Sequence, residues 1–316
     1  MGDIRNSGPR TGQSLGPESI PLWLRFAPVV FLLLWSAGFS FVKMGLAYAE
    51  PMTFLVLRYA LVVAVLLPVY LTLRPPLPRT RAAWGHLAVI TLFIQVLYFG
   101  LCYVAIDLGM SAGAVALIVS LQPILVALVA PRLAERVGAR RWAGLGLGFL
   151  GAVLVIFARS AIEAESARGI FCAIGALLGM TAGALYEKRF NVSAHPVTSN
   201  LLQNALGIAA VLPVAWIAED MRIVWTGELV LALGYLVIAN SLVSLTLLVA
   251  MIRWGEVSRV SALFFLVPPT SALIAWALIG EVMPWLAWVG TAIAALGVAI
   301  ASRAAIPNSS AEGALP

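Results

Sequence analysis

The sequence carries an internal duplication, and each copy consists of five apolar segments long enough to cross a membrane. A shift of 146 residues pairs Ala116, Leu117, Pro123, Glu135, Trp142, Gly144 and Gly151 with Ala262, Leu263, Pro269, Glu281, Trp288, Gly290 and Gly297. A shift of 145 pairs Ala37, Gly38, Lys43, Pro51, Thr53 and Ala60 with Ala182, Gly183, Lys188, Pro196, Thr198 and Ala205. Because five is odd, the second copy has to enter the bilayer with the opposite orientation. Two inverted copies around a site at mid-depth are a recurrent architecture of secondary transporters.

Composition and segment length both place the chain in a membrane. It is 62% hydrophobic and 11% charged, with a mean hydropathy of +0.99, which excludes an ordinary soluble domain. About 20 apolar residues cross the roughly 30 Å hydrocarbon layer. Segments of that length cover residues 22–45, 51–73, 83–106, 110–131, 141–158, 169–188, 196–217, 228–252, 258–280 and 284–303. We therefore expect an all-α membrane protein with ten transmembrane helices, arranged as a 5+5 inverted-topology repeat around a central cavity.

The polar segments complete the expected organisation. Residues 1–21 form a disordered tail, 22–159 the first repeat, 168–303 the second, and 304–316 a further tail. With the N-terminus in the cytoplasm, fifteen Lys and Arg residues fall on the cytoplasmic side and four on the outer side. That bias predicts cytoplasmic termini, and it explains the net charge of +6 without a nucleic-acid partner. Arg58 lies about two turns into the second span, and we expect its side chain to extend to the outer interface.

Two spans are broken by proline at matching depth. Pro123 interrupts the fourth span and Pro268-Pro269 the ninth, and a proline in a helix removes one backbone hydrogen bond. Such breaks suit a hinge or a cavity wall, although a kink that only improves packing is the alternative. The first and sixth spans share the small-residue runs Ser36-Ala37-Gly38 and Thr181-Ala182-Gly183. These runs permit close approach of a backbone or a substrate, or serve packing alone.

The third and eighth spans carry the best polar candidates for substrate binding. Gln95 and Asn240 are superposed by the 145-residue shift, and a carboxamide at mid-membrane depth needs partners. At helical spacing Gln95 shares a face with Tyr98, and Asn240 with Ser244. These side chains could hold the polar end of a substrate, or the two amides could only join helices. Aromatic side chains, Phe39 and Phe264 among them, could stack on an apolar part of it.

Other chemistry has no visible basis in the sequence. The spans hold no pair of carboxylates, which favours a neutral or zwitterionic substrate over a cation. No hydrolase or metalloprotease motif is present, so we expect no enzyme activity, no metal and no cofactor. The pattern Gly146-x-Gly148-x-x-Gly151 lies inside an apolar span and indicates a packing face, together with Gly144, rather than a nucleotide site.

The chain resembles the drug/metabolite transporter superfamily in three features. These are the ten-span repeat, the run Trp35-Ser-Ala-Gly-Phe-Ser40, and the paired Leu-x5-Pro-x11-Glu stretches at 117–135 and 263–281. Within it they are most similar to EamA-type exporters, and among these to YddG-type exporters of aromatic and other amino acids. The resemblance covers residues 22 to about 303. It implies alternating access through a cavity formed by spans 1, 3, 4, 6, 8 and 9, and a place in the bacterial inner membrane.

The sequence thus predicts a monomeric carrier, surrounded by membrane lipid, that exports amino acids and related small neutral metabolites. Its expected substrate contacts are made by Ser36, Phe39, Gln95, Tyr98, Asn240, Ser244 and Phe264, and its expected hinges are Gly38, Pro123, Gly183, Pro268 and Pro269. Two alternatives remain open at this point. One is a drug or nucleoside efflux carrier, and the other is a membrane protein that senses or binds a ligand without moving it.

Overall fold

The computed structural model describes residues 22–129, 138–160, 166–190, 195–254, 263–279 and 284–303. Both expected tails, 1–21 and 304–316, lie outside these residues. The described elements are helices, apart from one isolated antiparallel bridge between Ala49 and Ile223. The first half contains α1 (Leu22–Leu46), α2 (Pro51–Leu73), α3 (Arg81–Thr91), the π-helix η2 (Leu92–Gly100), α4 (Leu101–Asp107), α5 (Ala112–Ser120), α6 (Gln122–Val129) and α7 (Ala139–Ser160).

The second half follows the same order of elements. It contains α8 (Ala167–Phe190), α9 (Pro196–Ala218), α10 (Gly227–Tyr235), the π-helix η4 (Leu236–Ser244), α11 (Leu245–Trp254), the 3₁₀ turn η5 (Phe264–Leu266), α13 (Val267–Ile279) and α14 (Trp285–Arg303). Local signals set several of the boundaries. Pro51 and Pro196 occupy the first turns of α2 and α9. The hydroxyls of Thr80, Ser111 and Thr226 accept hydrogen bonds from backbone amides in the first turns of α3, α5 and α10.

Seven described helical stretches are long and apolar enough to span a membrane. They are Phe26–Leu46, Pro51–Leu73, Arg81–Asp107, Ala112–Val129, Ala167–Glu187, Pro196–Ala218 and Gly227–Leu248, and α14 adds a shorter apolar stretch, Trp285–Ala301. The segment expected at 141–158 corresponds to α7. Of the segment expected at 258–280, residues 258–262 and 280 lie outside the described residues, and the rest contains η5 and α13. The chain is therefore a multi-pass helical membrane protein.

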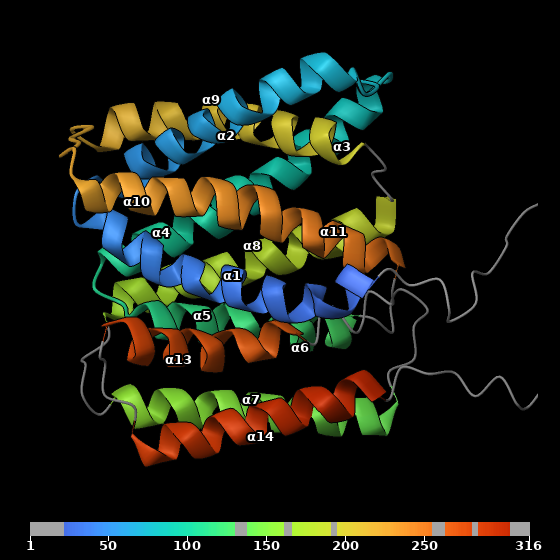
Figure 1. The fold of residues 1–316 in the computed structure, drawn as a ribbon, viewed down its shortest axis with the longest axis vertical. Coiled ribbons are helices and arrows are strands. Elements are labelled where there is room, and N and C mark those ends of the chain that lie inside the picture. Colours follow the sequence, from blue (N-terminus) through green and yellow to red (C-terminus); the bar gives the residue numbers. More distant parts are fainter. Residues whose placement is uncertain are drawn as a thin grey trace, which may run out of the picture.

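The helices run side by side in one bundle (Figure 1). α2 and α9 lie along one edge and α7 with α14 along the opposite edge, while α1, α8 and α10 pass between them. α1 begins and α14 ends at the right-hand end of the bundle in this view. The short connections at 47–50, 108–111 and 219–226 lie at the left-hand end, which we call the junction end.

The α7–α14 pair is held by backbone contact at glycine. An alanine Cβ at Gly144 would lie 2.5 Å from the Ala301 nitrogen, and one at Gly151 would lie 2.5 Å from the Gly290 carbonyl oxygen. Only hydrogen at these positions lets the two helices approach so closely. The glycine pattern predicts this face correctly, except at Gly146, where an added Cβ meets nothing within 4 Å.

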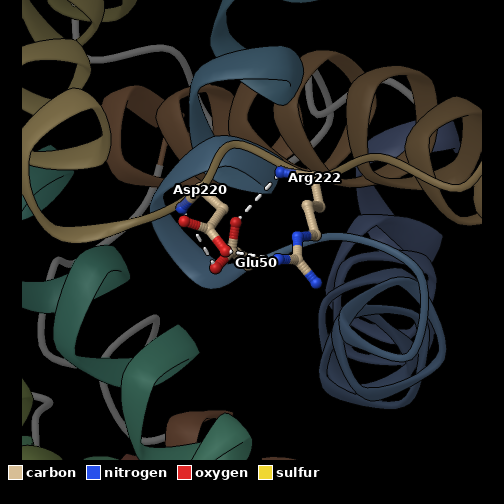
Figure 2. Close-up of polar contacts among 3 residues, drawn as sticks. All are labelled: Glu50, Asp220 and Arg222. Carbon is tan, nitrogen blue, oxygen red and sulfur yellow. Dashed lines mark hydrogen bonds and ion pairs between the residues drawn. The ribbon is translucent and has the colours of Figure 1, made fainter.

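Two glutamates join the halves at the junction end. The Glu219 carboxylate, just after α9, accepts hydrogen bonds from the Met52 and Thr53 amides at the start of α2, at 2.7 and 2.8 Å. It also accepts one from the Thr53 hydroxyl at 2.7 Å. The Glu50 carboxylate, just before α2, accepts hydrogen bonds from the Asp220 and Arg222 amides, at 3.4 and 3.0 Å (Figure 2). Arg222 and Asp220 also form an ion pair with each other. These carboxylates satisfy amides that a helix start and a loop leave free.

Candidate functional site

Two π-helical segments occupy related positions in the repeat. η2 contains Gln95 and η4 contains Asn240, and each nine-residue segment lies in the middle of a membrane-length helix. The wider π turn changes the direction in which the following side chains point, and π turns are frequent at functional sites. The Gln95 carbonyl, inside η2, accepts a 2.7 Å hydrogen bond from the Tyr59 hydroxyl on α2. Both halves of the chain are therefore irregular at the depth where the sequence predicts substrate contact.

A small cavity lies between α1, α2, η2 with α4, and η4. Aromatic side chains form much of its wall, and its polar side chains include Arg58 and Asn240. The lining residues are Trp35, Gly38, Phe39, Val42, Arg58, Tyr98, Phe99, Cys102, Tyr103, Ile106, Leu236 and Asn240. Its volume is about 30 Å³, which is room for about two water molecules. Pockets that bind small molecules hold roughly 300–1,000 Å³. This conformation is therefore closed to a metabolite.

Arg58 is the principal polar group of the cavity wall. The prediction that its side chain extends to the outer interface was wrong. The side chain is 3% exposed and does not extend to an interface. Leu55, Tyr59 and Val62 are buried at helical spacing around it, so residue 58 faces the bundle interior. The sequence holds no signal for this orientation, because α2 is apolar on every side and only the packing of the bundle shows which face is buried.

Neutral groups surround the Arg58 guanidinium. Its Nε and Nη2 donate to the Ser241 hydroxyl at 3.2 and 3.0 Å, and Nη2 also donates to the Asn240 Oδ1 at 3.1 Å. Its Nη1 donates to the Tyr103 hydroxyl at 3.0 Å. The Phe99 ring lies 4.5 Å from the guanidinium carbon, within the range of a cation–π contact. These bonds tie α2 to α4 and η4, and they position one positive charge at the cavity.

Gly38 brings α1 against the second π segment. A Cβ at residue 38 would lie 2.5 Å from the Asn240 side-chain nitrogen, so the glycine leaves space for that amide. The related Gly183 on α8 approaches the first π segment, where an added Cβ would lie 2.6 Å from the Ile94 Cδ1. The two small-residue runs therefore pack against the two π-helices, each in the opposite half of the chain.

The structure brings some predicted site residues together and not others. Gly38, Phe39, Tyr98 and Asn240 line the cavity. Phe264 packs in the aromatic cluster next to the cavity, with its ring centroid 5.9 Å from that of Trp35. Three further predicted residues, Ser36, Gln95 and Ser244, are buried outside the lining.

Those three residues share an unusual feature. The Ser36 and Ser244 hydroxyls and the Gln95 Oε1 are buried and have no hydrogen-bond partner among the described residues. Gln122, next to Pro123, has an unpartnered Oε1 as well. Buried polar atoms without a partner are rare in folded proteins, and a change of conformation can supply one.

The predicted breaks occur where the prolines lie. α5 ends at Ser120, and α6 begins at Gln122 with Pro123 as its second residue. In the second half the 3₁₀ turn η5 directly precedes Pro268 and Pro269 in α13. Among the described residues, no three His, Cys, Asp or Glu side chains are grouped so that they could hold a metal ion.

Comparisons with known proteins agree with this architecture. The model of the EamA-like transporter family matches the chain twice, at residues 23–157 and 167–303. The chain belongs to this family. The crystal structure of a protein with 20% sequence identity superposes with a TM-score of 0.72, over 89% of this chain and 98% of that one, and so has the same fold.

Curated relatives are distant in sequence. The chain is 25% identical to the uncharacterized transporter YvbV of Bacillus subtilis, over 75% of this chain and 77% of that protein. It is 22% identical to a probable amino-acid metabolite efflux pump of Salmonella typhimurium, over 87% and 93%. It is 23% identical to an uncharacterized transporter of Archaeoglobus fulgidus, over 84% and 93%. The protein is thus a membrane transporter by family, and none of these matches identifies its substrate.

Proposed function

We propose that this EamA-like transporter exports amino acids, aromatic and hydrophobic ones included, and related small metabolites across the bacterial inner membrane by alternating access. One observation carries the proposal. A cavity lies inside the bundle, and residues of both sequence halves, such as Tyr98 and Asn240, form its wall. A site shared by two halves can open to either side when the halves rock against each other. The efflux pump relative supports amino-acid metabolites as the substrate class.

The transmembrane topology is part of this proposal. Ten spans form two inverted five-helix repeats, at 22–159 and 168–303. An even number of crossings agrees with α1 beginning and α14 ending at the same end of the bundle (Figure 1). The positive-inside bias assigns that end to the cytoplasm and the junction end to the outer face. Cysteine labelling from each side, at residue 48 and at residue 77, tests the assignment; labelling of residue 77 from outside intact cells contradicts it.

Opening the cavity requires the helices around it to move. We assign the movement to the broken helices, with Pro123, Pro268 and Pro269 as hinges and with Gly38 and Gly183 as the sliding contacts. The unpartnered atoms of Ser36, Gln95 and Ser244 then gain partners from substrate or water in an open state. Phe39, Tyr98, Asn240 and Phe264 complete the proposed substrate contacts. The protein acts as a monomer, because both halves of the site come from one chain.

Solute counterflow into liposomes tests the function directly. Purified protein is reconstituted, the vesicles are loaded with unlabelled amino acid, and the uptake of labelled amino acid from outside is followed. We expect uptake above that of empty liposomes for at least one aromatic or aliphatic amino acid. Replacing Gln95 or Asn240 by leucine should lower that uptake. Exchange of nucleosides or cationic drugs alone would instead favour the alternative carrier class.

Accessibility separates a carrier from a protein that only binds a ligand. Single cysteines at positions 95 and 240 are introduced after Cys102 and Cys172, the two native cysteines, have been replaced. A carrier exposes these positions to water-soluble thiol reagents from both sides in turn, and substrate changes the balance. A cysteine at Leu178, which is 56% exposed on the outer surface of α8, is the control that faces lipid. Labelling from one side only contradicts alternating access.

A further inference from the structure

The Arg58 guanidinium is a buried cation that has no anionic hydrogen-bond partner among the described residues. All its hydrogen-bond partners, Ser241, Tyr103 and Asn240, are neutral. The one ion pair found among the described residues joins Arg222 to Asp220 at the surface of the junction end. The described residues that line the cavity include no aspartate or glutamate. One net positive charge therefore stays inside the bundle, about two turns from the start of α2.

Such a charge is unfavourable unless something compensates for it. Placing an arginine at the centre of a membrane costs about 2.5–3.5 kcal/mol on insertion scales. Hydroxyl and amide oxygens and the Phe99 ring reduce that cost, but they leave the net charge unchanged. In a low-dielectric cavity the remaining field attracts an anion strongly and repels a cation.

The geometry also leaves capacity for a bond to that anion. A guanidinium has five N–H groups, and Arg58 makes four hydrogen bonds in the closed cavity. The Tyr98 side chain lies in the same wall, and its hydroxyl is a group that can donate a further hydrogen bond. The remaining guanidinium N–H is on Nη1, and a carboxylate oxygen can accept its hydrogen bond and supply the negative charge that Arg58 lacks. Trp35 and Phe39 contribute apolar surface to the same cavity wall.

We propose that Arg58 selects substrates by their carboxylate, and that the amino group of an amino acid is not recognised. The inference rests on the proposed function, because it names the group that the same cavity binds. The site pairs a carboxylate with Arg58 and Tyr98 and packs an apolar or aromatic body against Trp35 and Phe39. Since no acidic side chain is among the described residues that line the cavity, an ammonium group finds no counter-charge from them. Monocarboxylates that lack the amino group are therefore substrates at least as good as the amino acids themselves.

A series of ligands with one skeleton tests this on the unaltered protein. Binding to purified protein is measured for L-phenylalanine, for 3-phenylpropanoate, which keeps only the carboxylate, and for phenethylamine, which keeps only the ammonium. The indole and isobutyl skeletons form parallel series. We expect 3-phenylpropanoate, or its counterpart on a better skeleton, to bind at least as tightly as the amino acid and at least tenfold more tightly than the amine. Equal binding of the amine, or no binding of any carboxylate in the three series, overturns the inference.

Variants of Arg58 then separate recognition from a structural role. R58Q should lower the ratio of carboxylate to amine affinity at least tenfold, while R58K should keep the preference with weaker binding. A purely structural residue would weaken both ligands equally and leave that ratio unchanged, which contradicts the proposal. Tyr103→Phe is the matched control, because it removes one hydrogen bond of the guanidinium but keeps the charge; its ratio should stay near that of the wild type. The ligand series on wild-type protein decides the matter even where R58Q does not fold.

The two proposals fail in different ways. Selective carboxylate binding without counterflow of any bound ligand contradicts transport and leaves the role of Arg58 intact. Counterflow of neutral solutes without carboxylate binding contradicts the role of Arg58 and leaves transport intact.

Discussion

The α7–α14 pair keeps the symmetry of the sequence repeat, whereas the cavity breaks it. In the helix pair the contacts are reciprocal. An alanine Cβ at Gly151 would meet the Ala294 nitrogen and the Gly290 carbonyl of α14, and one at Gly297 would meet the Gly148 nitrogen and the Gly144 carbonyl of α7. Each half supplies the same small residues at the same spacing, and both helices use them alike.

At the cavity the related positions differ in kind. Arg58 reaches across the bundle to Asn240, while its counterpart Gln203 donates at 2.8 Å to Ser199 on its own helix. Asn240 accepts a charged hydrogen bond, while the Oε1 of its counterpart Gln95 has no partner among the described residues. The Arg58–Asn240 region at the cavity is therefore cationic, whereas the related Gln203 and Gln95, which lie outside the lining, are neutral.

This difference shows what duplication does and does not provide. A packing interface needs only complementary shape, which two copies of one sequence give twice. A site that distinguishes the two ends of a small molecule needs two unlike corners, so the copies must diverge there. The predictions below use pairs of related positions, so that each pair measures symmetry or its loss.

The largest expected effect is at the glycine contact. Gly151→Ala and Gly297→Ala should each destabilise the protein by about 3 kcal/mol, because the added methyl group meets backbone atoms that cannot move aside. Gly146→Ala, on the same helix as Gly151 but facing open space, should be neutral or stabilising by up to about 1 kcal/mol. Melting temperatures in detergent compare the three. Unequal losses for residues 151 and 297 would show that this interface is not symmetric.

The two amides should differ in their contribution to stability. Asn240→Leu removes an acceptor of the Arg58 guanidinium and should destabilise the protein by about 2 kcal/mol, since hydrogen bonds to charged groups are worth about 1.5–3 kcal/mol. Gln95→Leu removes an oxygen that has no partner among the described residues, and should change stability by less than about 0.5 kcal/mol. Both are measured as melting temperatures beside counterflow rates. A melting temperature of Gln95→Leu well below that of Asn240→Leu would contradict the prediction that Asn240 contributes more to stability than Gln95.

The small-residue runs that contain Gly38 and Gly183 should differ less in their effect on stability. Gly38→Ala places a methyl group against the Asn240 amide and should cost about 1–2 kcal/mol, with a tenfold or greater loss of transport. Gly183→Ala meets chiefly the flexible end of Ile94 and should cost less than about 1 kcal/mol, with a smaller loss of transport than Gly38→Ala. Initial counterflow rates distinguish the pair. Equal losses of transport would mean that Gly38 acts in packing rather than through Asn240.

The smallest effect concerns the starts of α2 and α9. The Thr53 hydroxyl donates to the Glu219 carboxylate at 2.7 Å, while the related Thr198 hydroxyl donates to the Pro76 carbonyl at 3.4 Å. Thr53→Val should therefore destabilise the protein by about 1 kcal/mol and Thr198→Val by about 0.3 kcal/mol. The difference in melting temperature between the two variants is the test. Glu219→Gln is a further variant, which removes the negative charge of the carboxylate that Thr53 contacts. A larger loss at Thr198 would make the opposite end of the bundle the more firmly joined one.

Much of the fold follows from the sequence for simple reasons. Long apolar segments must be helical in lipid, because their backbone groups have no other partners there. The boundaries at Pro51 and Pro196 and the interruptions near Pro123 and Pro268 follow from the missing amide of proline. The depth of Gln95 and Asn240 follows from counting residues along a span. All of these depend on one segment at a time.

The environment of Arg58 depends on several segments at once. Residue 58 meets Tyr103, Asn240 and Ser241, which lie 45 to 183 positions away in the chain. Depth along α2 allowed the side chain to extend to the surface, and only the rotation of α2 within the bundle directs it inward. That rotation is decided by the packing of Phe54, Tyr59 and Val62 against other helices.

The sequence by itself therefore determined the class of the protein, its duplicated helical plan and the depth of its polar groups, because hydrophobicity and helical periodicity act locally. Only the tertiary structure decided which of those groups share a cavity and what charge that cavity carries. Side chains far apart in the chain share an environment only after the helices have packed, and the energy of a buried charge depends on every group that surrounds it.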